Sequence, residues 1–164
     1  MKLGILSDSH GRRDRVRQAV RVLEEAGAEA FIHCGDLGDL EVLEEFVGRR
    51  MWFVFGNMDF TRPTWRPLVE GLALPWPDGT VELQLAGKHV AVFHGHEQAF
   101  ARALRETPYD YLLHGHTHRR EDYRVGTMRI INPGALHRVS IPTVALLDVR
   151  ADTVEFIEIR DEAR

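Results

Sequence analysis

Two kinds of hydrophobic pattern alternate along the first third of the chain. Short apolar runs, which are typical of buried strands, occupy residues 2–7, 30–34 and 51–55. Apolar residues spaced three and four positions apart predict a helix over 13–26, with Gly27 directly after it as a stop, and a second helix through 40–47. Each apolar run ends in a polar cluster. Three strand-loop-helix units therefore bring polar side chains to the carboxyl ends of their strands.

The remainder of the chain is richer in strand signals. Residues 60–78 hold four of the seven prolines together with Trp65 and Trp76, which predicts a loop or a short helix. After this segment we expect one helix, at 97–105, and seven strands, at 80–85, 89–93, 109–113, 123–125, 128–131, 143–149 and 153–159. Hairpins should join 80–85 to 89–93 and, around Gly126, 123–125 to 128–131. No repeat or linker interrupts the pattern. We predict one α/β domain over residues 1–164, a mixed sheet or pair of sheets with helices on the outer faces.

Composition narrows the class of protein. The 164 residues are 44% hydrophobic and 28% charged, with a net charge of -4 and both signs scattered, which argues against a nonspecific nucleic-acid binder or a polybasic membrane module. Cys34 is the only cysteine, so an intramolecular disulfide or a thiolate-rich metal site is excluded, and a reducing compartment fits. No apolar run approaches the roughly 20 residues of a membrane helix, and no secretory signal opens the chain.

The polar clusters at the predicted strand ends contain only oxygen and imidazole donors. They are Asp8-Ser9-His10, Gly35-Asp36, Gly56-Asn57, His94-Gly95-His96 and Gly115-His116-Thr117-His118. Such donors suit Mn²⁺, Fe²⁺, Co²⁺, Ni²⁺ or Zn²⁺. The candidates exceed what one tetrahedral site uses, and a second ion about 3.5 to 4 Å from the first, sharing one carboxylate, would use the surplus. The neighbouring glycines let the backbone turn sharply toward a metal.

The order of these motifs resembles the calcineurin-like metallophosphoesterases. That family shows D-x-H, GD, GN, a lone H and GHxH in this order, matched here by Asp8 and His10, Asp36, Asn57, His94, and His116 with His118. IHCGD at 32–36, HGHTH at 114–118 and INPG at 131–134 resemble its small bacterial and archaeal phosphodiesterase branch. The resemblance spans residues 3 to about 149, and its five motifs in the correct order are far more specific than any one alone.

The resemblance implies a four-layer α/β/β/α sandwich and phosphoester hydrolysis at two divalent ions, with Mn²⁺ expected. It implies one ion bound by Asp8, His10 and His118, a second bound by Asn57, His94 and His116, and a bridge at Asp36. A hydroxide held between the ions would attack phosphorus in line while the metals stabilise the phosphate oxygens. No Ser, Cys or Lys nucleophile is then required.

One position departs from the wider family. Many relatives have a histidine after the GN motif that protonates the leaving group or holds the phosphate, whereas this chain has Met58. The narrower branch also lacks that histidine, so the change weakens a phosphomonoesterase function more than a phosphodiesterase function. We expect Asp59 to orient His96, and His96 to contact the phosphate or the leaving group. A polar start to the helix at 97–105 is the alternative for His96.

Isolated residues also have ordinary structural explanations. Asp8 and Asp36 could cap helices and Asn57 could suit a turn, although the full pattern favours ligation. Other residues are expected in supporting or surface positions: hydrogen-bonded His33 and His114, buried Cys34, surface His89 and His137, and a turn at 132–134 beside the metals.

Two further groups keep alternatives open. Four arginines closely follow a motif: Arg12, Arg13, Arg62 and Arg120. Each could bind two oxygens of a substrate phosphate, although a solvated surface position is the simpler expectation for any one of them. The tryptophan-bearing segment 60–78 could form a lid, a subunit contact or packing on the core.

These observations predict a cytoplasmic phosphodiesterase that acts on a small diester and forms a dimer or tetramer. A membrane partner is not expected, and the acidic balance disfavours a long nucleic acid. A non-catalytic scaffold, as in the retromer subunit of this fold, is one alternative, for which lost ligands would be the sign. A phosphomonoesterase or nuclease with the same ions is the other.

Overall fold

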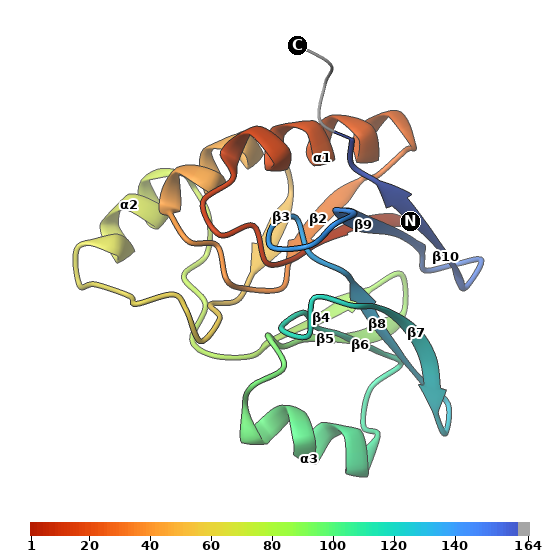
Figure 1. Cartoon of the computed structure of the whole chain (residues 1–164). Helices are drawn as coiled ribbons and strands as arrows, with labels where there is room; N and C mark the ends of the chain where they lie inside the picture. Colours follow the sequence, from red (N-terminus) through yellow and green to blue (C-terminus); the bar gives the residue numbers. More distant parts are fainter. Residues whose placement is uncertain (161–164) are drawn as a thin grey trace.

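The computed structural model describes residues 1–160 and contains two five-stranded sheets with helices on their outer faces (Figure 1). The first sheet has the order β10-β9-β1-β2-β3, with β1 at Lys2–Leu6, β2 at Ala30–His33, β3 at Met51–Phe53, β9 at Thr143–Asp148 and β10 at Thr153–Glu158. Strands β1, β2 and β3 are parallel, whereas β9 runs antiparallel to β1 and β10. The loops after the three parallel strands therefore leave the sheet at the same end.

The second sheet also has three neighbouring parallel strands, here at its centre. Its order is β4-β5-β6-β8-β7, with β4 at Val81–Leu85, β5 at Lys88–Val92, β6 at Tyr111–Leu113, β7 at Arg120–Val125 and β8 at Met128–Pro133. Strands β5, β6 and β8 are parallel, and β4 and β7 pair antiparallel at the two edges. Both expected hairpins are present, with Leu85 opposite Lys88 and Val125 opposite Met128.

Alternation along the strands divides the apolar side chains among three cores. Leu3 and Ile5 of β1 pack between the two sheets with Val90 and Val92 of β5. Leu6 faces the other way, toward the helices on the first sheet. A third core lies between the second sheet and its helix. Three stacked cores require four layers, so the α/β/β/α sandwich is confirmed.

The helices cover the outer faces much as the hydrophobic pattern predicts. Helix α1 (Arg13–Glu25) buries its predicted stripe of Val16, Ala19, Val20 and Leu23, and the chain leaves through Gly27 at a φ of 93°. On the second sheet, α3 (Gln98–Glu106) ends at left-handed Thr107. Figure 1 shows α1 and α3 on opposite outer faces of the molecule.

The helix expected through 40–47 is a 3₁₀-helix instead, η1 (Leu40–Phe46). The Asp39 side chain caps its start by accepting the Glu41 N–H at 3.1 Å, and Gly48, with a φ of 77°, turns the chain just beyond its end. The tight 3₁₀ winding is common in such short pieces, and it still buries the four apolar residues Leu40, Val42, Leu43 and Phe46.

Segment 60–78 packs on the core. It contains a short helix, α2 (Trp65–Gly71), as expected. Its two tryptophans rest against Phe55, with ring centroids 6.0 Å away for Trp65 and 4.9 Å for Trp76. Of the three roles considered for this segment, core packing is therefore the one observed in the folded chain. Residues 161–164 of the predicted domain lie outside the described residues.

Candidate metal centre

The predicted ligands come together from loops of both sheets. Asp8, Asp36 and Asn57 follow the three parallel strands of the first sheet, whereas His94 and the 116–118 loop follow β5 and β6 of the second. Direct contacts join the two sets: His94 Nδ1 lies 2.8 Å from the Cys34 carbonyl oxygen, and the His116 N–H donates to Asp8 Oδ2 at 3.1 Å. The site therefore lies where the carboxyl ends of parallel strands from two sheets meet.

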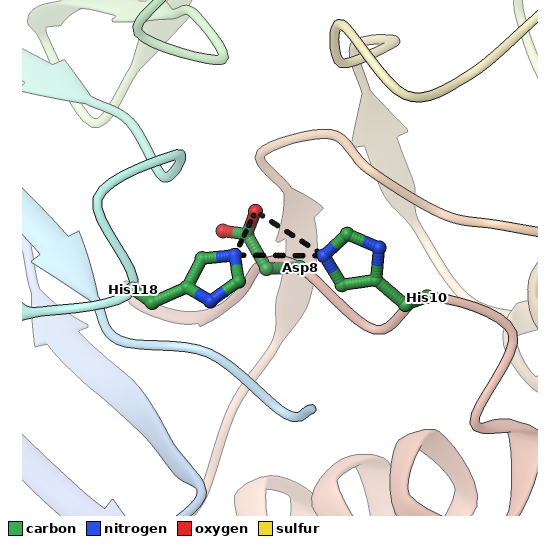
Figure 2. Close-up of side chains that lie close together, drawn as sticks. All are labelled: Asp8, His10 and His118. Carbon is green, nitrogen blue, oxygen red and sulfur yellow. Dashed lines mark hydrogen bonds and ion pairs between the residues drawn. The ribbon is translucent and has the colours of Figure 1, made fainter. Parts of the chain in front are cut away.

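Asp8, His10 and His118 form the first group of donors, which Figure 2 shows pointing toward one another. Asp8 Oδ1 is 3.2 Å from His118 Nε2 and 4.0 Å from His10 Nε2, and the two imidazole nitrogens are 3.5 Å apart. Asp8 Oδ2 accepts the Ser7 hydroxyl at 2.6 Å, whereas buried Oδ1 has no hydrogen-bond partner within residues 1–160. An unpaired buried carboxylate oxygen is costly, and a cation would satisfy it.

The second group lies around Asp36 and His94. Asp36 Oδ2 is 3.4 Å from His94 Nε2 and 3.8 Å from His10 Nε2, so one oxygen faces imidazoles of both groups. Asn57 Oδ1 lies 3.0 Å from His94 Nε2 and 3.1 Å from His116 Nδ1. The donors are thus oxygen and imidazole nitrogen only, and the set fits two hard or borderline divalent cations.

Five of the predicted ligands hold a strained backbone. The φ angles of Asp8, His10, Asp36, His116 and His118 are 53°, 44°, 53°, 71° and 59°. A left-handed conformation costs a residue with a Cβ roughly 1–2 kcal/mol. Such strain persists only where the surrounding structure imposes it, and it concentrates at functional sites. Its accumulation on these residues supports a site built for binding.

Electrostatics keep the central carboxylate ionised. Burial opposes the charged form of Asp36, but hydrogen bonds from His94 and the Met58 N–H, with the charges of His94 and His10, lower the pKa of Asp36 to about 2. Burial disfavours the charged form of His94, yet the hydrogen bond and charge of Asp36 outweigh it and raise the pKa of His94. Both shifts favour an ion pair between the two side chains, which a bound cation would replace.

His33 braces the loops that carry Asp8 and Asp36. The Gly35 N–H donates to His33 Nδ1 at 3.2 Å, so the imidazole proton is on Nε2, which donates to Ser9 Oγ at 2.9 Å. The Ser9 hydroxyl in turn donates to the Leu37 carbonyl at 3.1 Å. This chain of bonds confirms that His33 is a hydrogen-bonded core residue. Burial, with the nearby charge of His94, lowers the pKa of His33 to about 3.

Asp59 provides a second brace, and the prediction that it orients His96 is wrong. Its carboxylate accepts three backbone N–H groups, from Leu37 at 3.1 Å, Gly38 at 3.0 Å and Gly56 at 2.8 Å. These bonds tie the loop after β2 to the loop after β3 and leave no contact with His96 among the described residues. Sequence reasoning missed this role because two of the three partners lie more than twenty residues away.

His96 lies at the open side of the second group. Its ring centroid is 5.4 Å from that of His94 and 6.1 Å from that of His116, and its side chain is 38% exposed. The carboxylate nearest to His96 is that of Glu97 rather than the expected Asp59, with Glu97 Oε2 3.7 Å from His96 Nδ1. The same carboxylate accepts the N–H groups of His94 and Gly95 at 2.7 Å, so it also holds this loop.

Several supporting residues behave as expected. His114 is buried with Nδ1 3.0 Å from the Gly115 carbonyl, and burial raises the pKa of the Cys34 thiol well above its usual range. In contrast, the turn expected at 132–134 is wrong for its first two residues, because Asn132 and Pro133 end strand β8. From this strand the Asn132 amide donates to the Gly115 carbonyl at 2.9 Å and to Thr117 Oγ1 at 3.0 Å, which supports the loop carrying His116.

Two of the four arginines considered for phosphate binding pair with carboxylates instead. Arg12 forms a bidentate pair with Asp14, and Arg13 binds Glu44 and Glu45 at 2.8 and 2.6 Å, so both have carboxylate partners. His137, expected at the surface, is half-buried with its ring 6.2 Å from that of His10. Sequence patterns did not single out its neighbour Arg138, which follows none of the ligand motifs.

A sequence model of the calcineurin-like phosphoesterase superfamily domain matches residues 1–152. The chain belongs to this superfamily. This phosphoesterase is 30% identical over 154 residues to the phosphodiesterase MJ0936 of Methanocaldococcus jannaschii, an alignment that covers 90% of the chain and 93% of the relative.

Solved structures show the same fold. An archaeal phosphodiesterase superposes with a TM-score of 0.85 at 28% identity, covering 96% of this phosphoesterase and 99% of the other chain. Yfce, a phosphoesterase from E. coli, superposes with a TM-score of 0.69 at 19% identity over 98% of this chain and 100% of its own, a likeness of fold. Within residues 1–160, no helix has the length and apolar character needed to cross a membrane.

The loop that carries Gly56 lies directly against Asp36, so we predict that Gly56→Ala destabilises the protein. A Cβ at Gly56 would overlap Asp36 Oδ1 and the Asp36 backbone nitrogen. We expect the free energy of unfolding to fall by about 1–3 kcal/mol, as for other overpacked sites. Gly71→Ala is the matched control, because a Cβ there meets no atom within 4 Å. Urea unfolding in EDTA measures both, and equal stability of the two variants would contradict the steric argument.

The neutral state of His33 predicts loss of stability in acid. The pKa of His33 is about 3 in the folded protein, against about 6.5 in the unfolded chain, so the unfolded chain binds a proton first. The contribution of neutral His33 to the free energy of unfolding is complete above pH 6.5 and is lost as the pH falls toward 3. The loss is about 2 kcal/mol at pH 5.

Urea unfolding between pH 8 and pH 5 in EDTA tests this. We expect His33→Asn to have a lower free energy of unfolding at pH 8 and a shallower decline with acid than the wild type. His89→Asn, at a half-buried position of β5 away from the candidate site, should keep the wild-type pH dependence. A pH dependence of His33→Asn as steep as that of the wild type would show that His33 is not the titrating group.

Proposed function

We propose that this phosphoesterase hydrolyses small phosphodiesters at two divalent metal ions. The observation that carries the proposal is the position of Asp36 Oδ2, which faces His94 Nε2 at 3.4 Å and His10 Nε2 at 3.8 Å, as a bridging ligand must. In this assignment Asp8, His10 and His118 would hold the first ion, Asn57, His94 and His116 would hold the second, and Asp36 would contribute to both. Mn²⁺ is the expected ion, since these donors accept it readily.

Each side chain has a task that its contacts support. When bound, a pair of divalent ions supplies an activated water and neutralises charge on the phosphate. His94 donates its Nδ1 proton to the Cys34 carbonyl oxygen at 2.8 Å, which leaves Nε2 directed at the site for ligation. The Met58 N–H holds Asp36 Oδ1 at 2.9 Å and so directs Oδ2 toward the imidazoles.

Hydrolysis forms a bond between the water oxygen and phosphorus and breaks the bond from phosphorus to the leaving oxygen. That oxygen must gain a proton when the leaving group is an alcohol. We assign this step to His96, whose partly exposed ring lies beside the second group of donors. Met58, which is 44% exposed, stands where many members of the wider family have a histidine. Its side chain has no ionisable proton, so it cannot act as the acid at that position. Phosphodiesters are thus favoured over monoesters.

Further parts of the proposal concern the setting of the enzyme. We propose a single domain over residues 1–164 that acts in the cytoplasm as a dimer or tetramer, which light scattering of the purified protein would test. The net charge of -4 favours a small diester over a long nucleic acid. The scaffold alternative is disfavoured because every expected ligand type is retained.

The first experiment uses chelator-stripped protein with bis(p-nitrophenyl) phosphate and p-nitrophenyl phosphate, with and without Mn²⁺. We expect cleavage of the diester only with Mn²⁺, and Asp36→Asn should reduce turnover by more than about 100-fold, since even outer-shell changes at metal sites cost 10–100-fold. Metal content by mass spectrometry should fall in parallel. Asp78→Asn, an exposed carboxylate in the turn before β4, is the control. Silence toward both esters with Mn²⁺, Ni²⁺, Co²⁺ and Zn²⁺ would favour the scaffold alternative.

A second experiment tests His96 by changing the leaving group. His96→Ala should lower kcat on a thymidine dinucleotide, whose leaving group is an alcohol, by about 100-fold, as for other general acids. On bis(p-nitrophenyl) phosphate, whose nitrophenolate leaves without a proton, the loss should be only a few-fold. Metal content should be unchanged, and His89→Ala is the control. An unchanged rate on the dinucleotide would exclude His96 as the proton donor.

A further inference from the structure

The segment after β8 runs along one side of the candidate metal centre. Its backbone is held from two elements: the Leu136 N–H donates to the Ser7 carbonyl at 3.2 Å, and Arg15 of α1 donates to the Leu136 carbonyl at 2.8 Å. These bonds place His137 and Arg138 next to the end of β1. The His137 ring centroid accordingly lies 6.2 Å from that of His10, one of the proposed ligands.

Arg138 differs from the arginines at the start of α1. Arg12 and Arg13 both bind carboxylates, whereas within residues 1–160 no hydrogen bond or ion pair occupies the exposed guanidinium of Arg138. Its backbone is also strained, with a φ of 59° that residues with a Cβ rarely adopt. An unpaired arginine held in a strained conformation beside a binding site is suited to pair with a ligand.

The charge of Arg138 acts on both histidines on this side of the site. Burial lowers the pKa of His137, and the charges of Arg12, Arg15 and Arg138 lower it further, while Asp14 opposes them. Burial lowers the pKa of His10 as well; the carboxylates of Asp36 and Asp8 oppose the shift, whereas the charge of Arg138 adds to it. The charge of Arg138 therefore acts on His10 as well as on His137.

We propose that Arg138, assisted by His137, binds a second phosphate group carried by one ester substituent of the substrate. This inference rests on the proposed function, since it requires the scissile phosphate to lie at the metal centre. A guanidinium presents a planar fork of donors that matches two phosphate oxygens. The preferred substrate is then a phosphodiester with a phosphorylated substituent, such as a phosphorylated nucleoside.

Competitive inhibition tests the proposal without depending on which substituent leaves. Bis(p-nitrophenyl) phosphate with Mn²⁺ reports activity, and thymidine 5′-phosphate and thymidine 3′,5′-bisphosphate serve as inhibitors at constant ionic strength. We expect the inhibition constant of the bisphosphate for the wild type to be about tenfold lower than that of the monophosphate, which is the effect of one charge-assisted contact. In Arg138→Gln this ratio should fall to about one, mainly through weaker binding of the bisphosphate.

Arg150→Gln is the matched control. Arg150 lies in the turn between β9 and β10, so this variant removes the same charge at another place. The turn follows Asp148, whose strand partner Lys2 begins β1, whereas Asp8 follows the other end of β1. This variant should keep both the tenfold ratio and the wild-type turnover.

Three outcomes would overturn the inference and are distinguishable. Cleavage of the reporter with equal inhibition by the two nucleotides would overturn the second phosphate site and leave the proposed function standing. Equal weakening of both inhibitors in Arg138→Gln would show that Arg138 contacts the scissile phosphate instead. No cleavage of the reporter by the metal-loaded wild type would overturn the proposed function, and the inference with it.

Discussion

Asp8 and Asp36 bury two carboxylates where the ends of two sheets meet, and the polar structure around them compensates that charge. A buried charge is strongly unfavourable unless it is paired and hydrogen-bonded. Each carboxylate meets this demand in the same way. One oxygen is held by the protein, through Ser7 and the His116 N–H for Asp8 and through the Met58 N–H for Asp36. The other oxygen faces imidazoles, so each carboxylate is oriented before any cation arrives.

Orienting the carboxylates requires the loops of both sheets to approach closely. Gly56 and Gly115 make this possible, because a Cβ at either position would overlap the loop carrying Asp36 or Asp8. The left-handed backbone at five predicted ligands is a further consequence of the crowding. The three N–H groups bound by Asp59 and the bonds of His33 and Ser9 offset this strain. The rigid sheets behind the loops allow the strained arrangement to persist.

The two sides of the centre present different chemistry to a substrate. Beside His10 lies the imidazole of His137, followed in the chain by Arg138, whose charge lowers the pKa of His10. Beside Asn57, the chain exposes Met58 and Phe60, at 44% and 74%. A diester has two substituents on one phosphorus, so under the proposed function one substituent would lie toward the segment of His137 and Arg138 and the other toward the apolar side chains of Met58 and Phe60.

The sequence by itself determined the elements and the candidate ligands. Helix α1 buries the four apolar residues that its spacing predicts, because a helical stripe depends only on neighbours within the same segment. The candidate ligands could be predicted because they lie in loops that follow strands, and parallel strands in one sheet deliver their ends to one place.

Tertiary structure decided the features that depend on segments far apart in the chain. The division of the strands into two sheets, the 3₁₀ winding of η1 and the aromatic packing of segment 60–78 all follow from neighbours that a local pattern does not contain. The same holds for Asp59, whose carboxylate binds loops of two strands, and for the segment carrying His137 and Arg138, which bonds of Leu136 with Ser7 and Arg15 hold beside the end of β1. Hydrophobic periodicity reports which face of an element is buried, but the partner of a polar side chain is known only when the chain has folded around it.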